Sequence, residues 1–550
     1  MNLSPEEKDI GKENFHTALG LTRREFLEGS IAAGVVSGAG LGAFYFKYGE
    51  SVGDPVRIGV IGTGDEGGVL MGAHTPAYAK IVAIADIRPY NVHRCFHGDQ
   101  SNPEAYAARP GLMKKYDWKS EDEAKKNVKV YGPYQELLDD PNVEAVIIAL
   151  PLHLHAPVAI EAMKKGKHVL TEKLMGHSVH ECKEMARVAA QTNMLLATGH
   201  QRHYSILYDN AKHMIQRGLL GDLHYIRAQW HRGNLPGKDS WSQPLPEELK
   251  ANLAKISSQL EKAKGAEIDA LAKQKKQAEL QLLDAAVDAS KYGYVEKKMP
   301  KGYVCSPLEE LIRWRLWDRT GGGLMAELGS HQLDAASIFV SAMREDGKKV
   351  KPIRVQAMGQ RCLFPEDRDC DDHVYCTYEF PSPHFDEDPN KKITVTYSSI
   401  NGNGFGGYGE IVYGTQGTLV LEREQEVMLY KGAATTTNVT VGKGGSAGPT
   451  LDTTATGGGP AAKVGSKAIG DGPVSRGYTE EIEHWAWCIR NRSPENLPKC
   501  HPEVALADAV IALTSNIAIR GQKQIDFKPE WFDINSDETP EGVTPTVPVA

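Results

Sequence analysis

The sequence predicts an α/β protein with two domains, an N-terminal one built on a doubly wound parallel sheet and a C-terminal one with a largely antiparallel sheet. Between residues 56 and 198, short apolar runs rich in β-branched residues alternate with helical stretches. Fully apolar strands separated by helices indicate a parallel sheet covered on both faces. Between residues 354 and 421, strand-like alternation of apolar and polar residues returns, and this pattern favours an antiparallel sheet.

The elements of the first domain follow from its apolar runs. We expect strands at Val56–Ile61, Ile81–Ala85, Val128–Tyr131, Ala145–Ala149 and His168–Leu170. We expect helices at Tyr134–Leu138, Ala156–Lys164 and Val179–Gln191. Each strand is short and bounded by helical or turn residues, as in a sheet with crossover connections.

The second domain is expected to combine helices with the antiparallel sheet. Helices are predicted at Ile206–Arg217, Glu480–Arg490 and Glu503–Ile519. Strands are predicted at Leu223–Trp230, Arg354–Arg361, Cys376–Phe380, Ile393–Ser399, Glu410–Tyr413 and Thr418–Leu421.

The two domains are expected to span residues 51–200 and 201–535. Three segments differ in composition from the rest of the chain. Residues 244–296 are rich in Ala, Glu, Lys, Leu and Gln at helical spacing, which predicts a helical hairpin inserted into the second domain. Residues 433–476 consist mainly of Gly, Thr, Ala and Ser and are predicted to form a flexible loop. Residues 536–550 are predicted to be a disordered tail.

Residues 1–50 are predicted to be an export segment. Thr22–Leu27 contains an arginine pair followed by Phe and Leu, and the apolar run 31–46 comes next. This arrangement predicts export of the folded protein by the twin-arginine machinery to the periplasm or another extracytoplasmic place. The aromatic residues Phe44–Phe46 suit a membrane interface, so removal of the segment and its retention as a membrane anchor both stay open.

Charge and cysteine content exclude two classes of partner. The formal net charge is -8 over 550 residues, and no basic stripe offsets it, which argues against nucleic acid as a partner. None of the eight cysteines forms a CxxC pair, so we predict no bound metal.

A glycine-rich turn follows the first predicted strand. Gly62 allows a tight turn, Gly64 lets the backbone approach a pyrophosphate, and Gly67 allows close helix packing. Asp86 ends the next strand and is placed to accept hydrogen bonds from an adenosine ribose. This context predicts a dinucleotide-binding Rossmann domain with NAD as cofactor. Arg88 lies within reach of a 2′-phosphate, which leaves NADP as the alternative.

Two further strand ends are expected at the same edge of the sheet, where open α/β sheets bind ligands. Pro151 and His155 follow the strand at 145–149 and are placed to line the cofactor cleft. His153 and His155 lie two residues apart, but no third metal ligand is near them in the sequence. Glu172 and Lys173 follow the strand at 168–170, where desolvation and the nicotinamide charge would lower the pKa of a lysine.

Two longer motifs are far more specific than the glycine turn. The run Gly166–Lys173 and the run Gly321–Asp334, together with the glycine turn and Asp86, resemble the Gfo/Idh/MocA oxidoreductase family. The resemblance implies a second domain with an open sheet, NAD(P) dependence, and sugar or cyclitol substrates. It also implies that Lys173 is the catalytic lysine and that the catalytic acid and histidine are Glu327 and His331.

The spacing of the second motif supports this assignment. Residues 327, 331 and 334 share one side of a helix, and a histidine with a carboxylate in one pocket can shuttle a hydroxyl proton. The chain departs from the family at two positions. Leu174 stands where the family commonly has Pro, and Glu327 is one methylene longer than the usual Asp.

The substrate is expected at the junction of the domains. Arg202, His203 and Tyr204 follow the last Rossmann strand and offer donors for a polyhydroxylated ligand. Trp230 offers a face for stacking on a sugar ring, and Asp334 shares the side of the helix with His331. We also expect a homo-oligomer.

Together these features predict an exported oxidoreductase that transfers a hydride between a tightly held nicotinamide cofactor and a hydroxyl group of a sugar or sugar derivative. The cofactor must be held because free NAD(P)H is scarce outside the cytoplasm. Two alternatives stay open: a redox-assisted, NAD-dependent glycoside hydrolase or lyase, and a non-catalytic, cofactor-binding sugar sensor.

Overall fold

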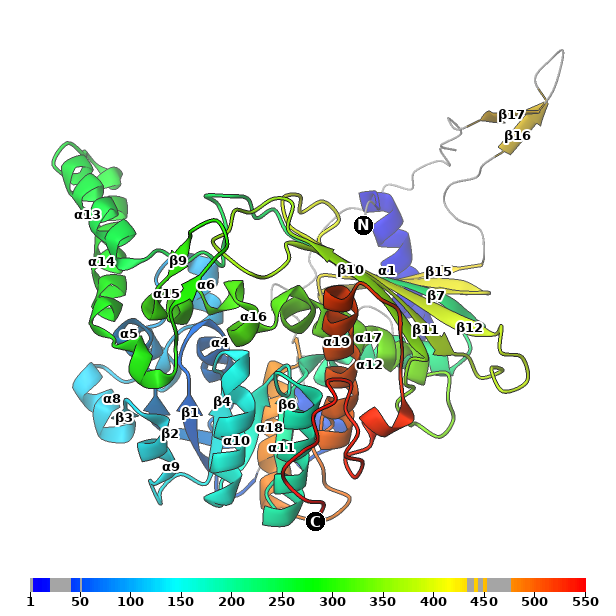
Figure 1. Cartoon of the computed structure of the whole chain (residues 1–550), viewed down its shortest axis with the longest axis horizontal. Helices are drawn as coiled ribbons and strands as arrows, with labels where there is room; N and C mark the ends of the chain where they lie inside the picture. Colours follow the sequence, from blue (N-terminus) through cyan, green and yellow to red (C-terminus); the bar gives the residue numbers. More distant parts are fainter. Residues whose placement is uncertain (1–2, 20–40, 50–51, 433–439, 444–448, 453–475) are drawn as a thin grey trace.

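The computed structural model describes residues 3–19, 41–49, 52–432, 440–443, 449–452 and 476–550, which form two domains lying side by side (Figure 1). The arginine pair predicted to direct export and the first ten residues of the apolar run lie outside the described residues. Most of the segment predicted to be a flexible loop, residues 433–476, also lies outside them.

The first domain contains a six-stranded, all-parallel sheet in the order β3-β2-β1-β4-β5-β6. Its strands are β1 (Val56–Ile61), β2 (Ala79–Ala85), β3 (Lys129–Tyr131), β4 (Ala145–Ile148), β5 (His168–Glu172) and β6 (Leu196–Gly199). The order reverses between β1 and β4, and ligands bind at such a switch point, beyond the carboxyl ends of the strands. The predicted Rossmann fold is confirmed.

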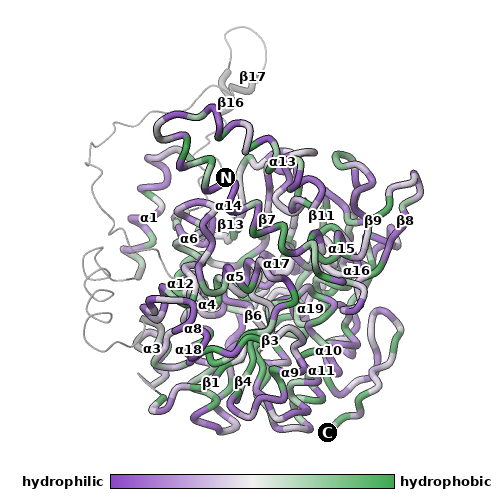
Figure 2. The backbone as a smooth tube through the Cα atoms, turned by 90° about the vertical axis from the view of Figure 1, so that its left-hand side faces the viewer, coloured by the Kyte–Doolittle hydropathy of each residue, from purple (hydrophilic) through white to green (hydrophobic). Residues whose placement is uncertain are grey.

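Both faces of this sheet are buried, which is why its strands are apolar throughout. Ile148 and Val169 pack with α10 (His155–Lys164) and α11 (Val179–Thr192) on one face. Val60 and Ile147 pack on the other face, with α4 (Asp65–Ala73) and α5 (Pro89–His97). In Figure 2 the backbone around β1 and β4 is correspondingly green.

The chain returns to the first domain near its end. Helix α18 (Tyr478–Arg490) contacts α4, β1, β2 and β6. Its residues Ile482 and Trp485 are fully buried in the core on that face. The Rossmann core is therefore completed by a helix more than 270 residues downstream of β6.

The second domain contains an eight-stranded sheet in the order β15-β14-β13-β7-β12-β11-β10-β18. The strands are β7 (Leu223–His231), β10 (Arg354–Gln360), β11 (His373–Pro381), β12 (Lys392–Ile400), β13 (Tyr408–Gly414), β14 (Gly417–Glu422), β15 (Glu426–Lys431) and β18 (Ile525–Asp526). All neighbours are antiparallel except β7 and β12. The predicted, largely antiparallel second sheet is confirmed.

Helices cover one face of this sheet. They are α12 (Ile206–Gln216), α17 (Ser330–Ser341) and α19 (Pro502–Gly521). Among the described residues, α19 alone is long and apolar enough to cross a membrane, but 78% of that stretch is buried inside the protein. It is accordingly a core helix, and Met358, which is 63% exposed, marks the uncovered face of the sheet.

A helical hairpin projects from the molecule over the first domain (Figure 1). It consists of α13 (Pro246–Leu260) and α14 (Ala266–Leu282), which pack on each other and lie within the predicted insert. Helix α14 and the short helix that follows it, Leu283–Ala286, contact α5 of the first domain.

Parts of the segment predicted to direct export pack against the body of the protein. Helix α1 (Pro5–Leu19) lies on β15 and buries Phe15. Further along, the hydroxyl of Tyr45 donates to Oδ1 of Asn210 at 2.7 Å, and the Lys499 ammonium lies over the Phe46 ring. The aromatic residues 45 and 46, which suit a membrane interface by composition, thus contact the protein itself.

The structure differs from the expectation of a disordered tail at residues 536–550. Arg187 and Lys183 of α11 are buried, and both donate to backbone carbonyls of the tail, including that of Ser536. Arg187 also donates to the carbonyl of Val547 at 2.8 Å. Because the polar composition of the tail does not reveal these partners on α11, sequence alone misassigns it.

We predict that Arg187→Ala destabilises the protein by about 2–4 kcal/mol, because the tail carbonyls lose their buried cationic donor. Thermal denaturation measures the loss, and proteinase K should cleave the tail faster. Arg492→Ala, which removes an exposed arginine, is the control. Unchanged cleavage of the tail in the Arg187 variant would contradict this role.

Candidate active site

The glycine turn has the conformation that its sequence predicts. Gly62 has φ +88°, and a Cβ atom there would lie 2.4 Å from the carbonyl oxygen of Ala149. A Cβ atom on Gly67 would lie 2.1 Å from the carbonyl oxygen of Gly62. Both positions therefore require glycine because of close backbone packing between β1, α4 and β4.

Gly64 has a different reason to be glycine. It caps α4 with φ −69°, and its nearest neighbour for an added Cβ is Nδ2 of Asn91 at 3.6 Å. No protein atom therefore crowds this position. The free space in front of the helix N-terminus fits a pyrophosphate, which such a terminus binds through backbone N–H groups.

Asp86 lies at the end of β2 and faces the glycine turn. Its Oδ2 accepts a hydrogen bond from the Thr63 backbone N–H at 2.7 Å and another from Asn91 at 3.1 Å. Its Oδ1 accepts from the backbone N–H of Arg88 at 2.8 Å. These bonds hold the carboxylate where the ribose of a dinucleotide would lie.

The two acidic residues inside the glycine motif point in different directions. Asp65 is half exposed and pairs with Arg94 at 2.7 Å. The Oε1 atom of Glu66, in contrast, is buried without a hydrogen-bond partner among the described residues. Burial raises the pKa of Glu66, and the nearby charges of Lys173 and Arg315 oppose that rise. Glu66 thus lies near Lys173, whereas its place in the glycine turn suggests exposure to solvent.

The segment after β4 is held in place by hydrogen bonds within the protein. Pro151 precedes a short helical turn, Leu152–Leu154. His155 is buried, and its two ring nitrogens lie 2.8 Å from the carbonyl oxygens of Leu150 and Leu174. His155 therefore links the loops after β4 and β5, and both of its nitrogens are used within the protein, so its predicted contact with a cofactor is not supported.

Lys173 joins the two domains. It follows β5, and its Nζ donates to the backbone carbonyl of Glu327 at 2.7 Å. Glu327 lies in a π-helical turn, Met325–Gly329, which leads directly into α17. The lysine and the motif that contains His331 therefore meet, although 154 residues separate Lys173 from Glu327.

The carboxylate of Glu327 is already paired. Its Oε2 accepts from Nε of Arg315 at 3.0 Å. Burial raises the pKa of Glu327, but the charges of Lys173 and Arg315 lower it by more, so the net shift is downward. Glu327 is therefore ionised and held by Arg315, and its role as the catalytic acid stays a prediction.

Glu172 is a buried acid next to the lysine. Its Oε2 accepts from the backbone N–H of Lys173 at 3.1 Å, and its Oε1 has no partner among the described residues. Burial, and then the charge of Glu66, raises the pKa of Glu172 to about 8. At neutral pH Glu172 is therefore mostly protonated.

His331 lies in the first turn of α17. Burial lowers the pKa of His331 well below its ordinary value, and the charges of Lys173 and Arg202 lower it further. Its ring lies 5.7 Å from that of Trp230, which stacks on Tyr408 at 4.4 Å. The site thus contains a lysine side chain, a neutral imidazole and an aromatic face.

Comparison with known proteins agrees with this geometry. Residues 56–200 match the model of the oxidoreductase family with an NAD-binding Rossmann fold, GFO_IDH_MocA. The Rossmann domain belongs to the Gfo/Idh/MocA family. The predicted family and its NAD-binding character are thereby confirmed for this domain.

Curated relatives match over about a fifth of this chain. An uncharacterized oxidoreductase of Schizosaccharomyces pombe is 36% identical over 115 residues, which cover 21% of this chain and 31% of that protein. The trans-1,2-dihydrobenzene-1,2-diol dehydrogenase of Mus musculus is 32% identical over 117 residues, which cover 21% of this chain and 35% of that protein. The chain thus spans about a third of the length of these relatives.

Solved structures share the fold over most of the chain. The aldose-aldose oxidoreductase of Caulobacter crescentus is 15% identical, with a TM-score of 0.50 over 86% of this chain and 100% of the other. Levoglucosan dehydrogenase in complex with NADH and L-sorbose is 16% identical, with a TM-score of 0.50 over 86% of this chain and 99% of the other. At these identities the likeness shows the fold alone.

The residues predicted to bind substrate after β6 are occupied by protein partners. Arg202 is buried and pairs with Glu424 at 2.5 Å, and Glu424 in turn pairs with Arg476. The hydroxyl of Tyr204 is buried and accepts from the backbone N–H of Lys499 at 2.8 Å. Arg202 and Tyr204 thus have partners within the protein, which the polar sequence of this loop does not reveal, and their contact with substrate stays a prediction. Trp230 keeps its place beside His331.

A cluster of titratable side chains lies behind the active site. Nε2 of His203 lies 2.8 Å from Oδ1 of Asp334, which also pairs with Lys349 at 3.2 Å. Lys349 pairs in addition with Asp508. His203 and Asp334 are consequently used inside the protein, so their predicted role in binding substrate is not supported.

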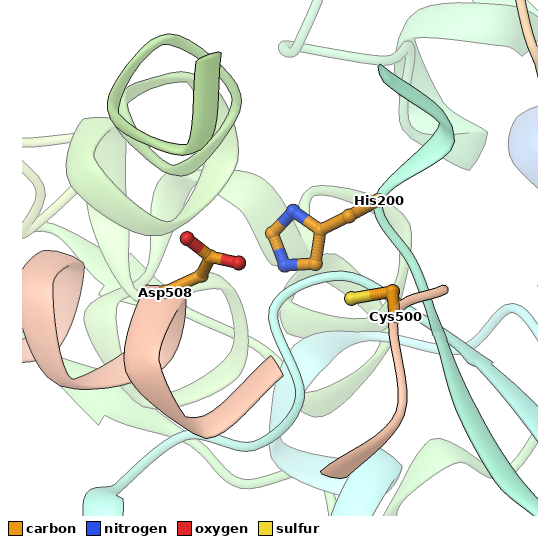
Figure 3. A group of neighbouring side chains, drawn as sticks. All are labelled: His200, Cys500 and Asp508. Carbon is orange, nitrogen blue, oxygen red and sulfur yellow. The ribbon is translucent and has the colours of Figure 1, made fainter. Parts of the chain in front are cut away.

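The same cluster is the strongest candidate for a metal site among the described residues. His200, Cys500 and Asp508 each place a ligand atom within 4.8 Å of the others, and Figure 3 shows the imidazole between the carboxylate and the thiol. Lys349 already supplies a cation to Asp508. The cluster is thus largely charge-balanced without a metal ion.

We predict that Glu172→Gln stabilises the protein selectively at high pH. Folding raises the pKa of Glu172 to about 8. Glu172 therefore contributes its full stability to the folded protein at acidic pH. That contribution is lost as the pH rises to about 8, because ionisation of the carboxyl group then favours the unfolded chain. The loss is of the order of 3–5 kcal/mol.

Thermal melts at pH 5 and pH 9 test this. The variant should gain thermal stability over the wild type mainly at pH 9, whereas the exposed control Glu261→Gln should follow the wild type. An equal difference at both pH values would show that Glu172 is ionised in the folded protein.

Proposed function

We propose that this protein is an exported NAD-dependent oxidoreductase that transfers a hydride between a tightly held cofactor and a hydroxyl-bearing carbon of a sugar or sugar derivative. One observation carries the proposal: Lys173, at the carboxyl end of β5, contacts the carbonyl of Glu327, one turn before His331. This contact brings a proton donor and a proton acceptor together beside the cofactor edge of the Rossmann sheet.

The residues at that edge fit a dinucleotide. The turn Gly62–Gly67 and the start of α4 would hold the pyrophosphate, and Asp86 the adenosine ribose. This order of sites directs the nicotinamide end toward β5 and Lys173. NAD supplies the hydride acceptor for the reaction when it is bound.

Lys173 and His331 have complementary roles toward a substrate hydroxyl. The Lys173 ammonium has three donors, one of which is used by Glu327, so it can orient the substrate oxygen. The lowered pKa of His331 keeps its imidazole neutral at physiological pH and able to accept the hydroxyl proton. Glu327 and Arg315 fix the position of the lysine.

A sugar suits the rest of the site. Trp230, supported by Tyr408, presents an aromatic ring beside His331, and such rings stack on sugar faces. Two proteins with the same fold are named for sugar chemistry, aldose-aldose oxidoreductase and levoglucosan dehydrogenase. A redox-assisted glycosidase would use the same site, because its first step is the same oxidation of a ring hydroxyl.

Support for export comes from the sequence alone. The arginine pair Arg23–Arg24, followed by an apolar run, matches a twin-arginine signal. This route carries folded proteins, so a bound cofactor would cross the membrane with the protein.

We predict that Lys173→Met and His331→Asn each lower turnover by about 10²- to 10⁴-fold, the usual contribution of a proton-transferring side chain. The assay incubates the purified protein with sugars and aryl glycosides and follows the absorbance of the reduced nicotinamide and the release of phenol. Lys164→Met, at an exposed lysine, is the control.

The outcomes of this assay separate the proposals. Loss of nicotinamide reduction in both variants supports the oxidoreductase, and phenol release without added cofactor indicates the glycosidase. Wild-type turnover in Lys173→Met would refute the assigned role of the lysine.

We predict that changing Arg23 and Arg24 together to Lys keeps the protein in the cytoplasm, because lysine conserves the charge but not the planar guanidinium group. Cell fractionation followed by immunoblotting measures the distribution. Arg492→Lys, at an exposed arginine, should be exported normally. An unchanged extracytoplasmic fraction in the double variant would disprove the twin-arginine route.

A further inference from the structure

A segment of the second domain covers the adenosine end of the dinucleotide site. Residues 283–312 connect the α13–α14 hairpin to the active-site motif. Within this segment Ala289 and Tyr294 are buried, and they pack with Ile87, the residue directly after Asp86. The Tyr294 ring also meets the His153 ring edge-on at 5.7 Å. The segment therefore spans the ends of β2 and β4.

Asp284 anchors this segment to the first domain. Its Oδ2 accepts from Nε of Arg88 at 2.8 Å, and its Oδ1 accepts from the backbone N–H of Tyr90 at 3.0 Å. The Asp284 side chain is 2% exposed and that of Arg88 is 17% exposed. Both oxygens of the carboxylate are thus committed to the loop that follows β2.

This pairing changes the charge that a nucleotide meets there. Arg88 is the basic residue within reach of a 2′-phosphate, and Asp284 neutralises it. With Asp86 included, the three side chains carry a net charge of −1. The 2′-hydroxyl of NAD can donate to Asp86 in such a place, whereas the 2′-phosphate of NADP would face two carboxylates and one committed arginine.

We propose that Asp284 is a specificity-determining residue that selects NAD over NADP by pairing with Arg88. The inference rests on the proposed dinucleotide site but does not depend on the reaction or the sugar. It assigns a function to the segment after the helical hairpin, which otherwise lies outside the catalytic machinery. The discrimination arises from the second domain, in addition to Asp86 of the first.

The test is a comparison of two nucleotides on the full-length protein. Isothermal titration calorimetry with NADH and NADPH, after removal of endogenous nucleotide, gives both affinities without any turnover. The wild type should bind NADH more tightly than NADPH. Asp284→Asn should raise the affinity for NADPH by about 10- to 100-fold, the value of one charge-assisted hydrogen bond, because Arg88 is released. Its affinity for NADH should change little.

Two further variants make the test specific. Asp288→Asn removes an exposed carboxylate from the same segment and should leave both affinities unchanged. Adding Arg88→Ala to Asp284→Asn should abolish the gain for NADPH. Circular dichroism and thermal melts verify that each variant is folded.

The outcomes separate this inference from the proposed function. Tight NADH binding with an unchanged ratio of affinities in Asp284→Asn would overturn the role of Asp284 alone. A wild type that prefers NADPH would also overturn it. Failure of the wild type to bind either nucleotide would overturn both this role and the proposed oxidoreductase.

Discussion

The site depends on one partly buried contact between the domains, the hydrogen bond from the Lys173 ammonium to the carbonyl of Glu327. A buried ammonium is costly unless it is paired and hydrogen-bonded. Here the carbonyl of Glu327 supplies the hydrogen bond, while the carboxylate of Glu327 accepts from Nε of Arg315 instead. Burial and the charges of Lys173 and Arg202 keep the pKa of His331 low, so its imidazole is neutral and able to accept a hydroxyl proton.

The second domain contributes mainly by holding α17, and with it His331, in place. Buried ion pairs flank this helix: Arg202 with Glu424 on one side, and Lys349 with Asp334 and Asp508 on the other. Removing one partner from such pairs leaves an uncompensated buried charge. Arg202, which follows β6, also donates to Gln332 of this helix and so helps to hold it in place.

Sequence patterns predicted the elements whose formation is local. The strand Val56–Ile61 and the helix Tyr134–Leu138 have the predicted bounds, because apolar runs and helical spacing are visible in short windows. The catalytic roles of Lys173 and His331 rest on motif resemblance and stay predictions, while the structure joins Lys173 to the turn that precedes His331. The burial of Tyr204 and the inward orientation of Glu66 were missed, since each depends on segments hundreds of residues away that no local pattern reveals.

A crystal structure of the protein with NADH tests the central claim most directly. The account predicts that the nicotinamide ring lies at the carboxyl end of β5, in contact with Lys173, with His331 facing the same ring atom from the second domain. A nicotinamide bound with its reactive carbon turned away from both side chains would contradict the account, even if the adenosine end occupied the glycine turn.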